Sequence, residues 1–376
     1  MKNYILLFIE SLSGGGAEKV LVTLLNHLDY SKYRITLLTL VDTGILKKKI
    51  DFSKIEYRTI IRQSSNPFLK FWYKIKYKLI YRYLPVKIVT KWIIPQKGID
   101  TYIAFTEGYC TKILAHTPKN KYAWVHIDLK ALPWTINEGI YKNLQEEKIA
   151  YSKYDKVICV SNSVKKIMTD EYGLEHVETI YNPIDTHDII EKSKKTTNIS
   201  VLNGFNLISI GRLVPQKGYD LLIPIINKLI KDGINVHLYI LGTGIEQQNL
   251  EKIISKEGIN NHIHLLGFQE NPYSIMEKMD LFVCSSRSEG YSLVIAEALT
   301  LGLPVISMNC SGPNELLDNN KYGRLCNSYE ELYQSIKSAI TDKEYYQDLK
   351  EKAAKRKDFF NINTTMQQID NLLSES

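Results

Sequence analysis

The stretch LFVCSSRSEGYSLVIAEALTLGLPVIS, residues 281–307, contains the pattern that decides the fold. Its first four residues, 281–284, are apolar and predict a buried strand, and residues 285–291 predict a polar turn. Residues 292–301 predict a helix, and the apolar residues 305–307 predict the next strand. The order of strand, helix and strand is that of a βαβ unit, so we expect a sheet with parallel strands.

Two glutamates of this stretch lie eight positions apart. Glu289 is expected at the carboxyl end of the first strand, and Glu297 about a turn and a half into the helix. The start of a helix is an anion site, because its first N–H groups have no partner within the helix. The donors expected there are Gly290, Tyr291, Ser292 and Leu293. A carboxylate beside such a site is unfavourable unless it binds hydroxyls, so the pattern favours a ligand with both phosphate and sugar.

The rest of the chain repeats the alternation of apolar runs and helical periodicity. Apolar runs at 4–9, 34–40, 101–105, 121–126, 156–159, 206–210, 236–241 and 262–265 predict further strands. A chain of 376 residues also exceeds the roughly 250–300 residues at which one hydrophobic core stops growing. We therefore predict two α/β domains, with the junction close to Asn182 and Pro183.

Composition places few restrictions on function but some on location. The five cysteines, Cys110, Cys159, Cys284, Cys310 and Cys326, are scattered singly, which is typical of buried thiols in a reducing cytoplasm. The first apolar run, 4–9, is too short for a signal-peptide core. No run approaches the roughly 18 apolar residues of a membrane span, so we expect a soluble or peripheral protein.

The net charge of +7 comes from one segment. Residues 57–99 contain ten Lys and Arg residues and no Asp or Glu, so the remainder of the chain is net acidic. Within it, residues 67–84 predict a helix that begins after Asn66 as N-cap and Pro67 in the first turn. Pro85 ends this helix.

The two faces of this helix differ in chemistry. Phe68, Trp72, Ile75 and Leu79 share one stripe, and Lys70, Lys74, Lys78, Tyr77 and Tyr81 share the opposite face. We expect the stripe to dock on the domain and the Lys/Tyr face to contact anionic lipid headgroups. The alternative is a basic face that is only solvated. Nucleic acid is not expected as a partner, because no recognised reading motif accompanies the charge.

Further candidate residues follow other predicted strands. Arg212 and Lys217, in GRLVPQKG, suit a diphosphate, although alone they fit two surface ion-pair partners equally well. Gly14, Gly15 and Gly16 lie between the first strand and helix, where backbone can approach a phosphate or simply form a flexible turn. Neither a dinucleotide fingerprint nor a P-loop occurs.

Two carboxylates also suit a glycosidase, which needs an acid to protonate a poor leaving group. A diphosphate leaves as a stable anion and needs cations and N–H donors instead, and these are the groups predicted here. The chain has no Asp-x-Asp pair, a spacing that many metal-dependent sugar-nucleotide enzymes use. We therefore predict catalysis without a bound metal.

Taken together, these residues resemble the retaining glycosyltransferases of family 4. The resemblance runs through SGGGAEKV, WVHIDLK, VSNSVKK, YNPID, GRLVPQKG, LGTG, LLGFQENP, SEGYSLVIAEALTLGLPVI and CSGPNELL, and covers most of the chain. Its densest part, EGYSLVIAE, carries the family's E-x7-E motif in full. The resemblance implies the GT-B fold, with two facing Rossmann-like, doubly wound parallel-sheet domains. These would be an acceptor-binding domain 1–182, a nucleotide-sugar domain 183–360, and a final helix in 361–376 that crosses back to the first domain.

The resemblance also implies residue roles. Arg212 and Lys217 would neutralise the donor diphosphate, with Gly15 and Gly16 approaching it from the first domain. Glu289 would bind the donor sugar and Glu297 the ribose. The remaining implied contacts are backbone at Gly267 and Phe268 to the base, N–H groups around Gly290, Tyr291, Ser292 and Leu293 to phosphate, and His126 at the transfer site. At a strand end, His126 also has an ordinary structural explanation.

Our interpretation is a retaining glycosyltransferase at the cytoplasmic face of the membrane, without a cofactor or metal. It would move a hexose or N-acetylhexosamine from a nucleotide sugar, with uridine the base implied by the resemblance, to a lipid-linked glycan in surface polysaccharide or capsule synthesis. Two alternatives are an epimerase on the same two-domain plan and a non-catalytic nucleotide-sugar-binding scaffold.

Overall fold

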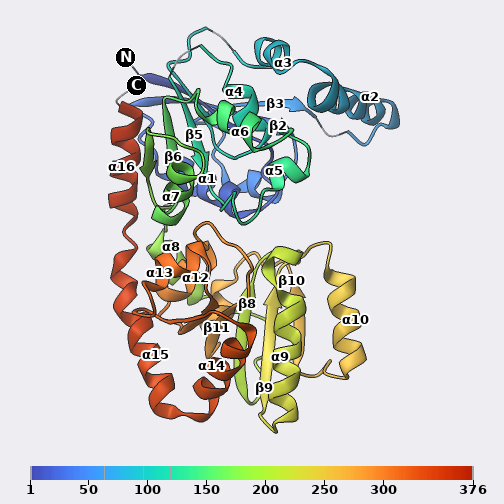
Figure 1. Cartoon of the computed structure of the whole chain (residues 1–376), viewed down its shortest axis with the longest axis vertical. Coiled ribbons are helices and arrows are strands. Elements are labelled where there is room, and N and C mark those ends of the chain that lie inside the picture. Colours follow the sequence, from blue (N-terminus) through green and yellow to red (C-terminus); the bar gives the residue numbers. More distant parts are fainter. Residues whose placement is uncertain (1, 63, 96, 119, 375–376) are drawn as a thin grey trace. The chain divides into compact units, whose positions relative to one another are not determined.

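The computed structural model describes residues 2–62, 64–95, 97–118 and 120–374, which form two compact units (Figure 1). The first unit comprises Met1–Pro183 with Asn363–Ser376, and the second comprises Ile184–Ile362. Each unit has its own parallel sheet and its own hydrophobic core. The predicted α/β class with parallel, doubly wound sheets is confirmed.

The first unit contains a seven-stranded parallel sheet in the order β3-β2-β1-β4-β5-β6-β7. Its strands are β1 (Asn3–Ile9), β2 (Tyr33–Val41), β3 (Glu56–Ile61), β4 (Thr101–Ala104), β5 (Lys121–Val125), β6 (Lys156–Cys159) and β7 (Val177–Thr179). The apolar residues of β1 from Ile5 to Ile9 are at most 2% exposed, as expected for a strand covered on both faces. The chain order reverses between β1 and β4, which defines the topological switch point of this sheet.

The second unit contains a six-stranded parallel sheet in the order β10-β9-β8-β11-β12-β13. Its strands are β8 (Phe205–Ile210), β9 (Val236–Leu241), β10 (Ile263–Gly267), β11 (Leu281–Cys284), β12 (Val305–Met308) and β13 (Arg324–Cys326). The switch point lies between β8 and β11, which pair through Leu281 with Leu207 and Phe282 with Ile208. The strand–helix–strand interpretation of 281–307 is therefore confirmed.

Helices connect the strands in both units. Those of the first unit are α1 (Gly16–His27), α2 (Pro67–Lys78), α3 (Val86–Ile93), α4 (Tyr109–Leu114), α5 (Trp134–Asn137), α6 (Leu144–Tyr151) and α7 (Asn162–Asp170). Those of the second are α8 (Thr186–Ser193), α9 (Tyr219–Lys231), α10 (Gln247–Glu257), α11 (Tyr273–Met276), α12 (Leu293–Thr300), α13 (Ser311–Leu317), α14 (Tyr329–Thr341) and α15 (Lys343–Arg356). None of the helices in the described part of the chain is long and apolar enough to cross a bilayer.

The last helix, α16 (Ile362–Ser374), packs on the first unit although it is at the end of the chain. Its Asp370 accepts a hydrogen bond from Tyr33 (2.6 Å) and pairs with Lys32 (2.7 Å). The amide of Asn3 donates to the carbonyl of Leu373 (2.7 Å). These contacts attach the C-terminal segment to the first residues of β1 and to the start of β2.

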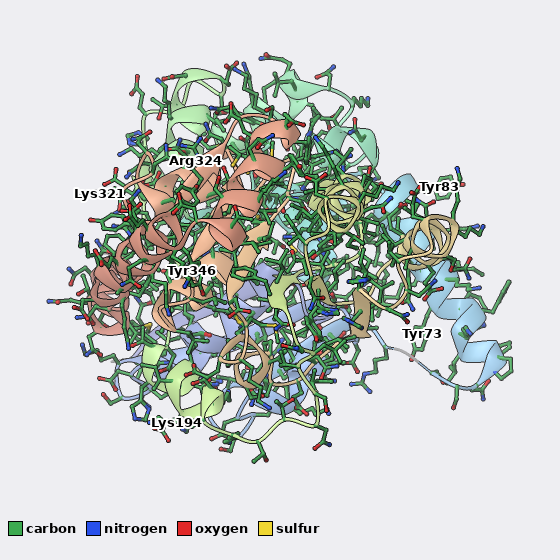
Figure 2. The ribbon with its side chains drawn as sticks, turned by 90° about the horizontal axis from the view of Figure 1, so that it is seen from below. Tyr73, Tyr83, Lys194, Lys321, Arg324 and Tyr346 are labelled. Atoms are coloured by element: carbon green, nitrogen blue, oxygen red, sulfur yellow. The ribbon has the colours of Figure 1, made fainter. Side chains whose placement is uncertain are left out.

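Helix α2 begins where the sequence predicts. The Asn66 side chain accepts a hydrogen bond from the backbone N–H of Phe68 (2.9 Å), and Pro67 occupies the first helical position. Lys70, Lys74 and Lys78 are exposed as predicted. Tyr73 and Tyr83, labelled in Figure 2, belong to α2 and to the turn after it.

The predicted docking of the apolar stripe of α2 is wrong. Phe68 and Trp72 are 67% and 52% exposed, Leu79 directly after α2 is 40% exposed, and Ile75 is half-buried. No residue of α2, all of which are described, is buried. The core is instead contacted by Tyr73 and Tyr81. A π-helical turn, Leu79–Tyr83, follows α2 and changes the angular position of Tyr81 relative to a regular helix. Tyr81 then stacks on the buried Tyr109 (4.1 Å between ring centroids), which the aliphatic stripe cannot do.

Candidate active site

The predicted donor-binding residues of the second unit meet at its switch point. Arg212 and Lys217 follow β8, and Glu289 follows β11, the strand paired with β8. In open α/β sheets, ligands bind at the carboxyl ends of the strands beside this point. Residues far apart in the sequence therefore lie at the position where the topology predicts a ligand.

Lys217 and Glu289 form a buried ion pair. The Lys217 Nζ and Glu289 Oε1 atoms are 2.5 Å apart, and the two side chains are only 16% and 10% exposed. Ser286 Oγ donates a second hydrogen bond to the same carboxylate oxygen (2.7 Å). Burial opposes the charge of Lys217, and repulsion from Arg212 adds to this, but attraction to Glu289 outweighs both and raises the pKa of Lys217. Lys217 is therefore a cation at neutral pH.

Arg212 is exposed and, among the residues that the structure describes, has no ion-pair partner within 4.0 Å. The explanation of Arg212 and Lys217 as surface ion-pair partners thus fails for both residues. Lys217 is paired but largely shielded from solvent, and Arg212 is exposed and has no ion-pair partner among the described residues. The contrasting cation nearby is Arg287, whose guanidinium forms a bidentate pair with Asp220 (2.8 and 2.9 Å) and also donates to the Pro215 carbonyl.

Two buried hydroxyls lie in the loop before α12. The Oγ atoms of Ser288 and Ser292 have no hydrogen-bond partner within the described residues. Ser292 also has φ of +67°, in the left-handed region that non-glycine residues rarely adopt. Unpaired buried polar groups and backbone strain both cost free energy, and both concentrate at ligand-binding sites. The hydroxyls are suited to hydrogen bonding with an oxygen-rich ligand.

Two glycines give this site its shape. Gly218 has φ of +68°, and a Cβ atom there would lie 2.2 Å from the carbonyl oxygen of Ser285. A Cβ atom at Gly312 would lie 2.7 Å from the backbone of Tyr291, and the Gly312 N–H donates to the carbonyl of Glu289 (2.9 Å). Close backbone packing therefore fixes the segment that carries Glu289.

The other predicted donor residues also belong to the second unit. Glu297 lies within α12 and is 3% exposed. Gly267 ends β10 with φ of +65°, and the ring of Phe268 directly after it is 53% exposed. Gly290, Tyr291 and Ser292 precede α12, and Leu293 is its first residue.

His126, Gly15 and Gly16 belong to the first unit. Gly16 begins α1 directly after Gly15, and His126 follows β5. Burial lowers the pKa of His126 to about 3, so its imidazole is neutral at physiological pH. Its Nε2 atom is buried and has no partner within the described residues. The Nε2 atom can therefore donate or accept one hydrogen bond with a ligand, depending on the tautomer, but the ring cannot act as a cation.

The carboxyl group that holds the backbone at His126 was not among the predicted residues. Glu107, at 3% exposure, accepts hydrogen bonds from the backbone N–H groups of His126 and of Ile127 (3.1 Å for Ile127). Burial raises the pKa of Glu107 to about 7. Ser286 was missed likewise. The only available signal was that both residues follow predicted strands.

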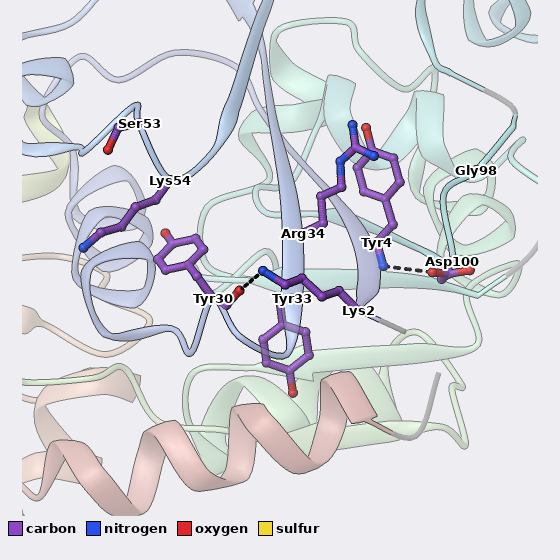
Figure 3. A pocket seen from close by; sticks show the side chains of 9 residues that line it. All are labelled: Lys2, Tyr4, Tyr30, Tyr33, Arg34, Ser53, Lys54, Gly98 and Asp100. Carbon is purple, nitrogen blue, oxygen red and sulfur yellow. Dashed lines mark hydrogen bonds between the residues drawn. The ribbon is translucent and has the colours of Figure 1, made fainter.

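A separate hollow of about 570 Å³ lies at the amino-terminal ends of β1, β2 and their neighbours in the first unit (Figure 3). It is lined by Lys2, Tyr4, Tyr30, Tyr33, Arg34, Ser53, Lys54, Gly98 and Asp100. Lys2 Nζ donates to the Tyr30 carbonyl (2.6 Å), and the Tyr4 N–H donates to Asp100 (2.8 Å). Its polar groups thus connect the beginnings of neighbouring strands, far along the strand direction from the switch point.

Comparison with known proteins identifies the class. Residues 14–188 match the family described as Glycosyltransferase Family 4, and residues 191–356 match Glycosyl transferases group 1. An uncharacterized glycosyltransferase of Methanocaldococcus jannaschii, MJ1178, is 30% identical over 80% of this chain and 80% of its own length. The N-acetylgalactosamine-N,N'-diacetylbacillosaminyl-diphospho-undecaprenol 4-alpha-N-acetylgalactosaminyltransferase of Campylobacter jejuni is 28% identical over 93% of both chains.

Among solved structures, Anabaena HepE in complex with UDP and glucose has a TM-score of 0.75 and covers 99% of both chains at 22% identity. At this identity the likeness concerns the fold alone. The two parallel-sheet domains and these matches define an enzyme of the GT-B glycosyltransferase class. The chain belongs to glycosyltransferase family 4, as the motifs from SGGGAEKV to CSGPNELL indicate.

Proposed function

We propose that this enzyme transfers a hexose or N-acetylhexosamine from a nucleotide diphosphate sugar, with uridine as the base, to a lipid-linked glycan with retention of anomeric configuration. The observation that carries the donor assignment is the buried pair of Lys217 and Glu289 beside the unpaired hydroxyls of Ser288 and Ser292. One switch point thus brings together a cation that can bind phosphate, a carboxylate that can bind sugar hydroxyls, and two hydroxyl groups without partners among the described residues. HepE was solved with UDP and glucose, which supports this ligand class.

The proposed reaction breaks the bond between the anomeric carbon and the diphosphate oxygen. The acceptor oxygen attacks the same face of the sugar, and its proton passes to the departing phosphate. Arg212 and Lys217 stabilise the negative charge that develops on the diphosphate. Glu289 orients the sugar and Glu297 the ribose. Neutral His126 offers a hydrogen bond at the transfer site, and the cations take the place that a metal ion has in other sugar-nucleotide enzymes.

A true donor stabilises the folded state by mass action, which gives the first test. A sugar nucleotide at about 100 times its Kd should add about 2.7 kcal/mol to the free energy of unfolding. We expect UDP-sugars to raise the Tm more than ADP- or GDP-sugars, with and without chelator. Arg212→Ala is the control and should reduce the shift. No shift with any sugar nucleotide, or a shift abolished by chelator, would contradict the assignment. Isomerisation of the donor in the absence of acceptor would instead indicate an epimerase.

The acceptor assignment draws on α2 and on one relative. The Campylobacter jejuni relative is named for an acceptor linked to diphospho-undecaprenol. Helix α2 exposes Phe68 (67%), Phe71 (59%) and Trp72 (52%) next to exposed Lys70, Lys74 and Lys78. Aromatic side chains between lysines are typical of helices that lie in a membrane interface. We infer that α2 binds the anionic inner face of the membrane through these lysines and these three aromatic side chains.

Replacing Lys70, Lys74 and Lys78 together with alanine should weaken binding to anionic vesicles about 100-fold at low salt. Each lysine near such a surface contributes about 1 kcal/mol, and the loss should shrink as salt increases. The measurement is co-sedimentation with vesicles of phosphatidylglycerol and phosphatidylcholine.

The matched control replaces Lys343, Lys350 and Lys355, three exposed lysines of α15, with alanine. This control has the same net charge and should bind vesicles like the wild type. If both triple variants lose vesicle binding equally, net charge alone accounts for binding. If neither loses vesicle binding, the basic face of α2 is only solvated.

A further inference from the structure

The switch point of the first sheet carries a carboxyl group that the proposed reaction does not use. Glu10 directly follows β1, whose neighbour across the switch point is β4. The same rule that places a donor at the end of β8 therefore predicts a second ligand at the end of β1. Glu10 accepts hydrogen bonds from the Tyr81 hydroxyl (3.4 Å) and from the Tyr109 backbone. Burial raises its pKa to about 7.

Three tyrosines form a continuous stack beside Glu10. The ring centroids of Tyr77 and Tyr81 are 4.2 Å apart, and those of Tyr81 and Tyr109 are 4.1 Å apart, with interplanar angles of 27° and 17°. Tyr109 is 3% exposed and its hydroxyl donates to the Ile80 carbonyl, whereas Tyr77 is 41% exposed. This tyrosine ladder thus leads from the core to the surface. The π-helical turn that positions Tyr81 belongs to a class of irregularity common at functional sites.

The charges around the ladder decide which ligand fits. Glu10 and Glu138 both act electrostatically on Tyr77, and Glu18 acts on Glu10. At the Glu10 end of the ladder these carboxyl groups disfavour a phosphate or another anion, whereas Lys74 and Lys78 lie on the exposed surface of α2. A pyranose ring fits better, because its C–H face packs on an aromatic ring while its hydroxyls donate to a carboxylate. The surroundings of the ladder are therefore those of a site for neutral sugar.

We propose that Glu10, Tyr77 and Tyr81 form the subsite that holds the terminal sugar of the acceptor. The Tyr77 end of the ladder stacks on the sugar ring, and Glu10 accepts a hydrogen bond from a sugar hydroxyl. This inference rests on the proposed function, since it takes the acceptor to be a saccharide. It adds the residues that select the acceptor and places them at the switch point of the first sheet, next to the end of α2.

The test separates acceptor binding from donor chemistry. The probe is a short-chain polyprenyl diphosphate carrying one N-acetylhexosamine, dissolved in detergent so that vesicle binding does not matter. We expect Tyr77→Ala to raise the KM for this acceptor about fivefold and Glu10→Gln about tenfold, with a smaller change in kcat. Tyr77→Phe keeps the ring and should retain the wild-type KM. Binding of the probe and of the donor, measured by calorimetry, should change only for the probe.

Three outcomes would overturn the inference, and they are distinguishable. If the wild type transfers sugar and both Tyr77→Ala and Glu10→Gln keep its acceptor KM, the subsite is wrong and the proposed function stands. If the wild type binds donor but neither binds the probe nor transfers sugar to it, the proposed acceptor class fails and the subsite fails with it. If Tyr77→Phe raises the acceptor KM as much as Tyr77→Ala does, the effect does not come from the ring, and ring stacking is excluded.

Discussion

Replacing Lys217 with alanine is expected to lower kcat/KM for sugar transfer on the order of 100-fold, or about 2.7 kcal/mol of transition-state stabilisation. The reason is that Lys217 is the buried cation of the site, paired with Glu289 at 2.5 Å, and a diphosphate gains negative charge as it departs. Removing it also leaves Glu289 buried without its partner, which costs stability. Steady-state kinetics with saturating acceptor would measure the first effect and thermal unfolding the second.

The two effects are separated by the double variant Lys217→Ala with Glu289→Gln. It should recover stability, because no buried charge remains unpaired, but it should not recover activity. Lys228→Ala is the matched control, since Lys228 forms an ion pair with Glu330 (3.1 Å) in which both side chains are about half exposed or more (49% and 63%). It should behave as wild type in both measurements. Wild-type kcat/KM for Lys217→Ala would remove the diphosphate assignment.

Replacing Gly218 with alanine is expected to lower the free energy of unfolding of the second unit by about 3 kcal/mol and to abolish donor binding. Gly218 has φ of +68°, and a Cβ atom there would lie 2.2 Å from the Ser285 carbonyl oxygen. Relief of this contact must move either Ser285, which precedes the Glu289 loop, or Lys217. All four tryptophans, Trp72, Trp92, Trp124 and Trp134, belong to the first unit, so unfolding of the second is followed by circular dichroism.

Gly233→Ala supplies the comparison. Gly233 also has a positive φ, +82°, but a Cβ atom there meets nothing within 4 Å. Gly233→Ala should therefore lower the free energy of unfolding by only about 1 kcal/mol, which is the cost of a side chain in the left-handed backbone region. Donor binding should remain intact. The difference between the variants isolates the contact with Ser285. Equal destabilisation of the two would show that the chain relaxes around Gly218 without disturbing the site.

The sequence predicts most of the strands, because parallel strands covered on both faces are continuous apolar runs. The runs at 156–159, 236–241 and 281–284 coincide with β6, β9 and β11. The missed strands are β3, β7 and β13. β7 and β13 have three residues each, too few for any periodicity, and their pairing with β6 and β12 defines them. β3 is an edge strand with the polar residues Glu56, Arg58 and Thr59, so it has no continuous apolar run.

The residue types of the candidate site could be read from the sequence, but the contacts among them could not. The hydrogen bond between Lys217 and Glu289 spans 72 positions and depends on the pairing of β8 with β11, which no local pattern contains. Periodicity was also insufficient for α2, because it groups residues by angle without showing which face has a partner. Tyr81 found a stacking partner in Tyr109, and the stripe that includes Phe68 did not.

The pairing of Lys217 with Glu289 has a consequence for selectivity. A free inorganic anion that approaches Lys217 must compete with Glu289, which is already in contact with it. If the anion displaced Glu289, this carboxylate would remain unpaired and largely shielded from water, which costs free energy. A molecule that brings hydroxyls and phosphates together compensates both partners at once. The pair therefore favours a ligand that carries both groups over a ligand that carries one. Orthophosphate should accordingly be a poor inhibitor, even at high cellular concentration.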